Sequence, residues 1–430
     1  MRHAWLPPLW AALTISPAWA QPAPERAAPW PSTAPGADAP ALTLEAAIAL
    51  ALQHRPELDA ARSQIEAADA ALLQAGAHPN PVFEAELEDT RRDTRTTTFM
   101  LNQPIELGGQ RAARQDAAGH ALMAARHQNE AQRARLRAQV TVAFIDALAA
   151  QQRLQLADAA LALAARASAA ATRRVAAGKV APIDETKAKV AEAAVRVEAA
   201  QAQAEWRAAL LALQAATGGG RRVERVDGTL QVPAVPAEEG LQARLADAPA
   251  LRLAELEVQR LGALARLERA RRVPDVTIGV GTRRSEELGR SQALLTLSIP
   301  LPVFDGNRGA EVETLRRQDK ARYEAQATRL RLQADVASAH SRLQAAVAEA
   351  KALEGEILPG AQAAYDISAK GFELGKFGFL DVLDSQRTLL QARTQHLKAA
   401  AQAHRAAADI DQLLAGPANP GDPTAAPRQP

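Results

Sequence analysis

The stretches QPIELGGQR (residues 103–111) and IPLPVFDGNR (residues 299–308) decide how this chain folds. In both, an alternating segment ends at proline, and a long segment almost without proline follows the glycines. Proline cannot donate to a strand ladder, and glycine reaches backbone angles closed to other residues. We therefore predict two corners at which a strand becomes a helix. Their residues are Pro104, Gly108, Gly109, Pro300, Pro302 and Gly306.

Each corner follows a pair of segments whose apolar residues alternate with polar ones. Phe83, Ala85 and Leu87, for example, fall on one face of an extended chain, and the intervening glutamates fall on the other. This pattern is what the strands of a water-filled membrane barrel need, and it is also found in a half-buried hairpin of a soluble protein. The predicted strands are residues 82–88, 97–103, 276–281 and 293–299, with loops at 89–96 and 283–291.

Long helices are predicted on both sides of the strands. Residues 110–176 contain no proline and one glycine, and residues 310–373 contain only Pro359. Each helix would be about 100 Å long at 1.5 Å per residue. Two shorter helices laid end to end would match that length, which favours a rod of helices side by side. The shorter helices are expected at residues 43–53, 56–78, 182–216, 239–247, 249–272 and 379–414.

The chain contains this plan twice, at a spacing of about 195 residues. A third anchor supports the duplication, because GKVAPID (178–184) corresponds to GKFGFLD (375–381). The repeat turns are Gly178, Lys179, Gly375 and Lys376. We expect a first repeat over residues 42–216, a linker over 217–240 and a second repeat over 241–415.

The ends and the composition indicate an exported protein. Residues 1–20 have a basic start, a short apolar run and Ala18-Trp19-Ala20, as in a cleaved secretory signal. A Pro/Ala-rich lead over 21–41 and a disordered tail over 416–430 are expected. There is no cysteine, aromatic residues are 3%, and the net charge is +2, which gives no indication of nucleic-acid binding.

No motif for catalysis, a cofactor or tight metal binding appears in a plausible setting. His120 and His127 are seven residues apart, whereas a ligand pair on a helix usually needs a spacing of three or four. No CxxC, HExxH, Walker or dinucleotide fingerprint is present. The sequence therefore predicts no enzymatic activity, no cofactor and no resident metal.

These features together resemble the TolC-like outer-membrane factor family. The resemblance rests on the doubled plan, the break HRPEL (54–58), the two corners and DVLD (381–384). It implies a mainly α-helical fold with a small β part, in which a homotrimer combines four strands per chain into a twelve-stranded outer-membrane barrel. It also implies a long helical barrel in the periplasm, a periplasmic adaptor and an inner-membrane pump of the resistance-nodulation-division type. The corners are similar to those of the branch that exports heavy-metal cations.

The resemblance further implies a narrow periplasmic aperture lined by Asp381 and Asp384, with Asp184 as the first-repeat counterpart of Asp381. Three chains would place six second-repeat carboxylates, two from each chain, around one axis, and such a ring attracts cations. Lys187 replaces the counterpart of Asp384. A different interpretation is that acids in a first helical turn only interact favourably with the helix dipole.

Other functions stay open at this stage. A drug-efflux or type I secretion channel would have the same fold. A soluble periplasmic coiled-coil adaptor would belong to another class, but it does not explain four alternating strands in a doubled chain. A hydrolase is a further class, and the chain lacks the motifs of one.

Overall fold

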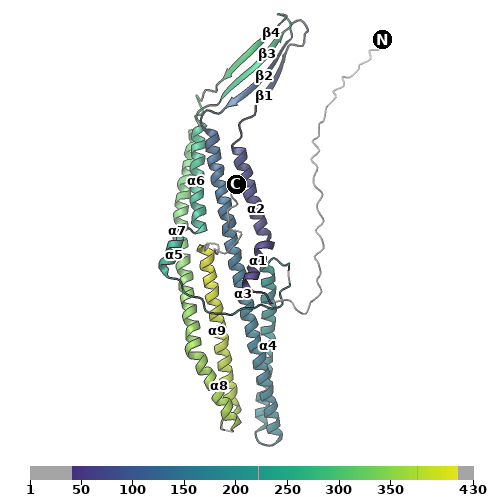
Figure 1. Cartoon of the computed structure of the whole chain (residues 1–430), viewed down its shortest axis with the longest axis vertical. Coiled ribbons are helices and arrows are strands. Elements are labelled where there is room, and N and C mark those ends of the chain that lie inside the picture. The colour runs from purple at the N-terminus through teal and green to yellow at the C-terminus, as the bar shows by residue number, and fades with distance from the viewer. Residues whose placement is uncertain (1–40, 221, 375, 415–430) are drawn as a thin grey trace, which may run out of the picture. The chain divides into compact units, whose positions relative to one another are not determined.

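The computed structural model describes residues 41–220, 222–374 and 376–414, and these residues form the unit in Figure 1. The expected signal peptide, nearly all of the lead, the tail and Gly375 lie outside them. The described chain is mainly helical with one small sheet, as the sequence predicts. The helices are α1 (Leu44–His54), α2 (Pro56–Ala75), α3 (Gln110–Ala176), α4 (Pro182–Ala216), α5 (Glu238–Leu245), α6 (Pro249–Ala270), α7 (Arg308–Ala352), α8 (Leu358–Glu373) and α9 (Phe379–Leu414). The strands are β1 (Val82–Glu88), β2 (Thr96–Ile105), β3 (Val276–Ser285) and β4 (Arg290–Ser298).

The helices lie side by side around α3, the longest of them. On one side α3 packs against α2 and then α4, and on the other against α6 and then α9. In the second repeat, α6 and α9 lie along α7, and α8 packs against α9. The expected end-to-end stacking of two short helices beside one long helix is therefore present in both repeats. Prolines begin α2, α4 and α6, where the missing N–H has no helical partner to lose.

A π-helical turn interrupts the second long helix. The turn η1 (Leu353–Ile357) separates α7 from α8, whereas residues 310–373 were expected to be one α-helix. Pro359 has no N–H to donate to the carbonyl of Gly355, four residues earlier, so this is where regular α-helical bonding fails. The helix nevertheless continues toward the same end of the unit, with a bend toward α9 (Figure 1).

The four strands form one antiparallel sheet in the order β1-β2-β3-β4, at one end of the helices (Figure 1). The register places Phe83, Leu101, Val280 and Leu295 in one row. These residues share one face of the sheet, and Glu84, Glu86 and Glu88 belong to the opposite face. Within the described residues, β1 and β4 are the edge strands.

The strands around the second loop are longer than expected. β3 continues to Ser285 and β4 starts at Arg290, so the predicted loop over 283–291 is reduced to residues 286–289. Arg283 and Arg284 pair with Gln292 and Ser291 in the ladder. The sheet has exposed faces, so a charged residue can stay in a strand without being buried.

The linker between the repeats is bound across several helices. Val226 bridges to Leu42, and the side chain of Gln151 on α3 contacts it twice: Nε2 donates to the Val226 carbonyl (3.0 Å) and Oε1 accepts from its N–H (3.2 Å). Further along, His404 Nε2 donates to the Gln231 carbonyl (2.7 Å). Burial lowers the pKa of His404, which favours the neutral ring as the donor.

The linker also covers the two main apolar clusters. One cluster includes Phe144, Leu148 and Leu213 with Val223 and Val226, and the other includes Leu241, Leu343 and Ile410. His340 Nε2 donates to the Pro236 carbonyl beside the second cluster (3.0 Å). The core is therefore concentrated at the level of the linker.

We predict that Gln151→Ala loosens the linker. Removing this side chain leaves the N–H and carbonyl of Val226 without their partner, which should cost about 1–3 kcal/mol. Hydrogen exchange at the Val226 amide should become faster. Gln155→Ala, at an exposed position one turn along α3, is the control and should leave that rate unchanged.

Candidate functional site

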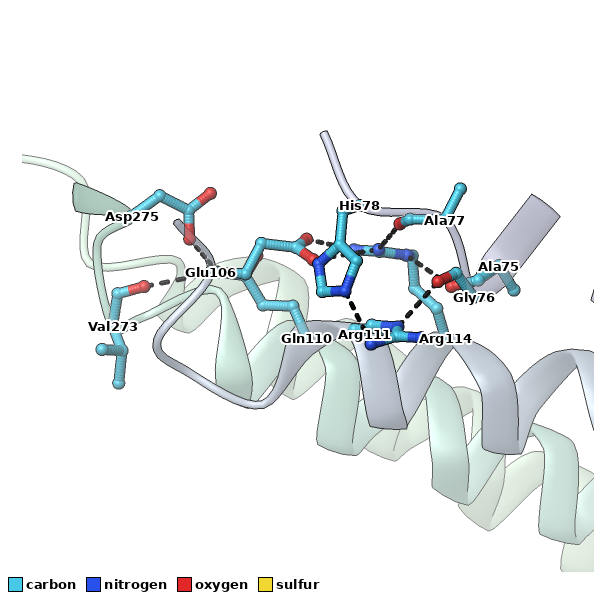
Figure 2. A network of polar contacts seen from close by, with 10 residues as sticks. All are labelled: Ala75, Gly76, Ala77, His78, Glu106, Gln110, Arg111, Arg114, Val273 and Asp275. Atoms are coloured by element: carbon cyan, nitrogen blue, oxygen red, sulfur yellow. Dashed lines mark hydrogen bonds and ion pairs between the residues drawn. The ribbon is translucent and has the colours of Figure 1, made fainter. Parts of the chain in front are cut away.

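Two arginines in the first turns of α3 close the end of α2, just below the sheet. Arg111 Nε donates to the Gly76 carbonyl (2.7 Å), and Arg114 donates to the carbonyls of Ala75 (3.4 Å) and Ala77 (3.2 Å). Figure 2 shows these side chains reaching across to the chain that leaves α2. They satisfy carbonyls that a helix end leaves unpaired, and their charge suits the negative end of the helix dipole.

Arg114 also binds Glu106, the residue between the strand β2 and the glycines of the corner. Both guanidinium Nη atoms contact the carboxylate, Nη1 to Oε1 and Nη2 to Oε2 (3.1 Å), and the Glu106 side chain is only 9% exposed. The hydrogen bond from Arg114 holds the pKa of Glu106 below its usual range. The stabilisation is therefore present at neutral pH and is lost as acid protonates the folded carboxylate.

The first corner is tied to the second repeat as well. Gln110 Nε2 donates to Asp275 Oδ1 (3.0 Å) and to the Val273 carbonyl (3.4 Å), both just before β3 (Figure 2). Gly108 lies against the end of α6, where an added Cβ would be 2.2 Å from the Ala270 carbonyl oxygen. Gly109 has φ of 77° and precedes α3. The sequence marked these glycines, but it did not single out Glu106 or Arg114.

The second corner uses asparagine where glycine was expected to be needed. Asn307, with φ of 53°, precedes α7, whereas Gly306 is not among the described residues with positive φ and has open space around it. Asn307 Nδ2 donates to the Glu268 carbonyl near the end of α6 (2.8 Å). The interpretation that Gly306 is required for its backbone angles is therefore wrong. Asparagine tolerates the left-handed region better than other side chains do.

The prolines behave differently at the two corners. Pro300 and Pro302 follow the last residue of β4, Ser298, as predicted for residues that end a ladder. Pro104 instead lies inside β2, opposite Thr277 of β3, and the strand continues to Ile105. The pairing with β1 has already ended at Asn102, so on that side no ladder remains for proline to interrupt.

A patch of exposed apolar residues follows β4 at the second corner. Leu301 and Val303 are largely exposed, and Phe304 is fully exposed. Leu295 and Leu297 share a face of β4, and the exposed Ile299, directly after the strand, leads into this patch. A chain in water gains nothing from such exposure, so the patch indicates a contact outside the described residues.

At the opposite end, the helices are joined by the repeat turns. Gly178 has φ of 68°, and Lys179 donates its N–H to the Arg174 carbonyl five residues earlier (2.9 Å), which is a Schellman ending. Lys376 makes the same bond to the Gly371 carbonyl (2.8 Å). Arg174 also lies over the ring of Phe372, 4.3 Å from its centre, so the ends of α3 and α8 touch.

The aspartates expected at the aperture have different surroundings. Asp381 Oδ2 accepts the N–H of Gly378 (2.8 Å) and so closes the start of α9. Asp384 is exposed, and Asp184 is half-buried in the first turn of α4. No hydrogen bond or ion pair among the described residues joins Asp184 to the other two. Asp381 thus acts locally at the start of its helix, as the alternative interpretation expects. Asp384 is not in the first turn of α9 and does not have that role.

Neither a metal cluster nor a membrane-spanning helix is present in the described ranges. No group of three or more His, Cys, Asp or Glu side chains in this part of the chain is placed to hold a metal ion. The helices described there are also not long and apolar enough for any of them to cross a membrane.

The comparisons with known proteins define the class. The model of a family described as "Outer membrane efflux protein" matches residues 47–219 and 240–416. The chain belongs to this family of outer-membrane efflux channels, as the corners and the doubled plan predict.

Two curated relatives and two solved structures are similar to this chain. It is 41% identical to the cobalt-zinc-cadmium resistance protein CzcC of Cupriavidus metallidurans, over 87% of this chain and 90% of that protein. It is 31% identical to the nickel-cobalt-cadmium resistance protein NccC of Alcaligenes xylosoxydans xylosoxydans, over 68% and 69%. A membrane protein from Pseudomonas aeruginosa superposes with a TM-score of 0.74 at 21% identity, covering 86% of this chain and 92% of that one. CusC superposes with a TM-score of 0.73 at 18% identity, covering 86% and 91%.

We predict opposite results for alanine at the two corner glycines. Gly108→Ala should weaken the junction, because its Cβ would meet the backbone of α6, which cannot move aside as a flexible side chain would. Gly306→Ala should be tolerated, because nothing lies within 4 Å of its added Cβ. Thermal unfolding of the purified proteins compares the two. Equal loss in both variants would contradict the assignment.

A double-mutant cycle should show coupling between Glu106 and Arg114. Each single change, Glu106→Gln or Arg114→Met, leaves one largely buried charge without its partner and should cost about 1–3 kcal/mol. The double change should cost less than the sum of the two. Additive losses in unfolding experiments at pH 7 would show that the contact is not energetically coupled.

Proposed function

We propose that this chain forms a passive channel in the outer membrane that carries divalent metal cations from the periplasm to the outside. The observation that carries the proposal is the sheet, with one apolar face, one polar face and two unpaired edges within the described residues. Four strands cannot close alone, but three copies supply twelve, enough for a barrel with a polar interior. The functional form is therefore a homotrimer.

The exposed patch at the second corner fits the same arrangement. In a barrel whose apolar face meets lipid, Leu301, Val303 and Phe304 would continue that face at the periplasmic edge of the membrane. The polar network around Arg114 would then lie just outside the lipid, where the helices begin. The partners of this corner are outer-membrane lipids.

The opposite end of the helices is the proposed contact for the rest of the pump. The turns at Gly178 and Lys376 would meet a periplasmic adaptor, which connects the channel to an inner-membrane pump of the resistance-nodulation-division type. That pump supplies the energy, and the channel needs no catalysis and no cofactor. An open conduit also needs no tight metal site, because tight binding would slow release.

The metal substrate is supported by the relatives, whose names describe resistance to cobalt, zinc, nickel and cadmium. The test uses a strain that lacks its own metal-efflux channel. The full chain, expressed with the adaptor and pump encoded by neighbouring genes, should restore growth of this strain on these metals. Export of drugs or of a protein, with no change in metal resistance, would favour the alternative channels of the same fold. Recovery of the protein as a soluble periplasmic monomer would contradict the proposal that it forms a channel.

The aperture assignment can be tested by separating its two aspartates. Asp384→Asn should lower the cation preference of purified trimers in planar bilayers, because it removes an exposed carboxylate from the narrow end of the pore. Asp381→Ala should mainly weaken the start of α9, because the N–H of Gly378 loses its acceptor, at a cost of about 0.5–2 kcal/mol. Asp158→Asn, at an exposed position in the middle of α3, is the charge-matched control. Unchanged selectivity in Asp384→Asn would remove Asp384 from the aperture.

A further inference from the structure

The helices carry a row of ion pairs at the height of the linker, on the face opposite to it. The pairs are Arg153 with Glu205, Arg405 with Asp146, and Arg342 with Asp409. Gln151 on α3 and His340 on α7 hold the linker. Arg153 and Arg342 each come two residues after one of these, and two residues turn an α-helix by about 200°. The ion pairs and the linker therefore lie on opposite faces of the layer.

Each ion pair connects two neighbouring helices of the layer. Arg153 on α3 binds Glu205 on α4. Arg405 on α9 donates from Nε (2.9 Å) and Nη2 (2.5 Å) to Oδ1 of Asp146 on α3. Arg342 Nη2 on α7 donates to Asp409 Oδ2 on α9 (3.3 Å).

Stability is a weak reason for these pairs. All six side chains are between 36% and 58% exposed. Exposed ion pairs contribute only about 0–1 kcal/mol to the free energy of unfolding. The repetition of such a pair at three successive helix contacts on one face therefore indicates a role of that face rather than of the fold.

Two of the carboxylates line a single hollow. This hollow of about 560 Å³ lies between α3, α4 and α9 and is lined mainly by alanine, with four polar side chains: Gln139, Asp146, Asp409 and Gln412. Carboxylate and amide oxygens are the ligands that hard divalent cations prefer. Arg405 and Arg342 belong to two adjoining hollows, which share Asp146 and Asp409 with the first. The arginines thus occupy the aspartates from either side.

The charges on this face also cancel. Among the described residues that line the three hollows, four acids accompany four bases: Asp146, Glu205, Asp335 and Asp409 with Arg153, Arg342, Lys398 and Arg405. A surface with mixed and balanced charge does not concentrate ions of one sign, as a surface of like charges does.

We propose that this face is the wall of the pore, and that Arg405 and Arg342 prevent Asp146 and Asp409 from retaining the divalent cations that pass. If the linker face pointed inward, three linkers would cross the pore, so the opposite face is the one that leaves it open. An arginine bound to a carboxylate occupies its oxygens and repels an approaching cation. This inference rests on the proposed channel and identifies residues that keep its wall from binding the substrate.

Removing the two arginines should make the wall bind metal. In the full chain, Arg405→Gln with Arg342→Gln frees both aspartates beside the same hollow. Zinc ions should then block the potassium current of purified trimers in planar bilayers at about tenfold lower concentration than in the wild type, because the carboxylates are no longer compensated. Equilibrium dialysis of the same trimers should show increased zinc binding.

Two matched variants separate masking from other effects. Arg405→Lys with Arg342→Lys keeps both charges and should be blocked like the wild type. Adding Asp146→Asn and Asp409→Asn to the double glutamine variant should abolish the extra block. If that fourfold variant is blocked as strongly as the double variant, the aspartates are not what the arginines mask, and the inference is wrong. If the double variant does not assemble, each single glutamine variant frees one aspartate and should show part of the shift.

The result also distinguishes this inference from the proposed channel. Trimers of the glutamine variants that conduct normally, with unchanged zinc block and zinc binding, would overturn the masking role and leave the channel intact. A wild-type chain that forms no pores would overturn the proposed function and this inference together.

Discussion

Alanine in the helix seams sets how closely the helices of this chain lie, and the arrangement in one layer depends on that closeness. Ala157, Ala199 and Ala202 fill the contact between α3 and α4, where larger side chains would push the helices apart. Close packing of small residues gives many weak contacts but little buried area for each residue. The layer therefore has no thick interior of its own. Its largest apolar clusters form only where the linker crosses it, and large apolar side chains on its outer helices, such as Val190 on α4 and Ile367 on α8, stay exposed.

The junction with the sheet must satisfy unpaired polar groups, because three segments of the chain meet there and change direction. The last carbonyls of α2, the corner after β2 and the approach to β3 all have polar groups that the ladder and the helices leave unpaired. Arg114 and Gln110 supply donors to all three from neighbouring turns of α3 (Figure 2). At the second corner Asn307 has this role, because its Nδ2 donates to both the carbonyl and the carboxylate of Glu268.

The features with a strong local cause could be predicted from the sequence. Proline and glycine mark the corners, the period of two marks the strands, and the absence of proline marks α3. The prediction failed where the cause is tertiary. Gly306 looked like the special position, but the left-handed residue is its neighbour Asn307. Arg283 and Arg284 looked like loop residues because they are charged, yet the exposed sheet accommodates them. Glu106 and Arg114 belong to no recognisable motif, because their pairing depends on how the corner between β2 and α3 folds against the end of α2. The different surroundings of Asp381 and Asp384 could not be predicted, because they depend on where the N–H of Gly378 lies.

The linker limits how the helices can move. It is held to α3 at Val226, to α9 at Gln231 and to α7 at Pro236, five residues apart each time. Five residues of extended chain span at most about 18 Å, and a peptide cannot be stretched further. While these bonds hold, the three helices cannot spread apart at this height. The turns at the far end can then move apart only if the helices bend below the linker. The displacement would increase with distance from the linker and be largest at the turns.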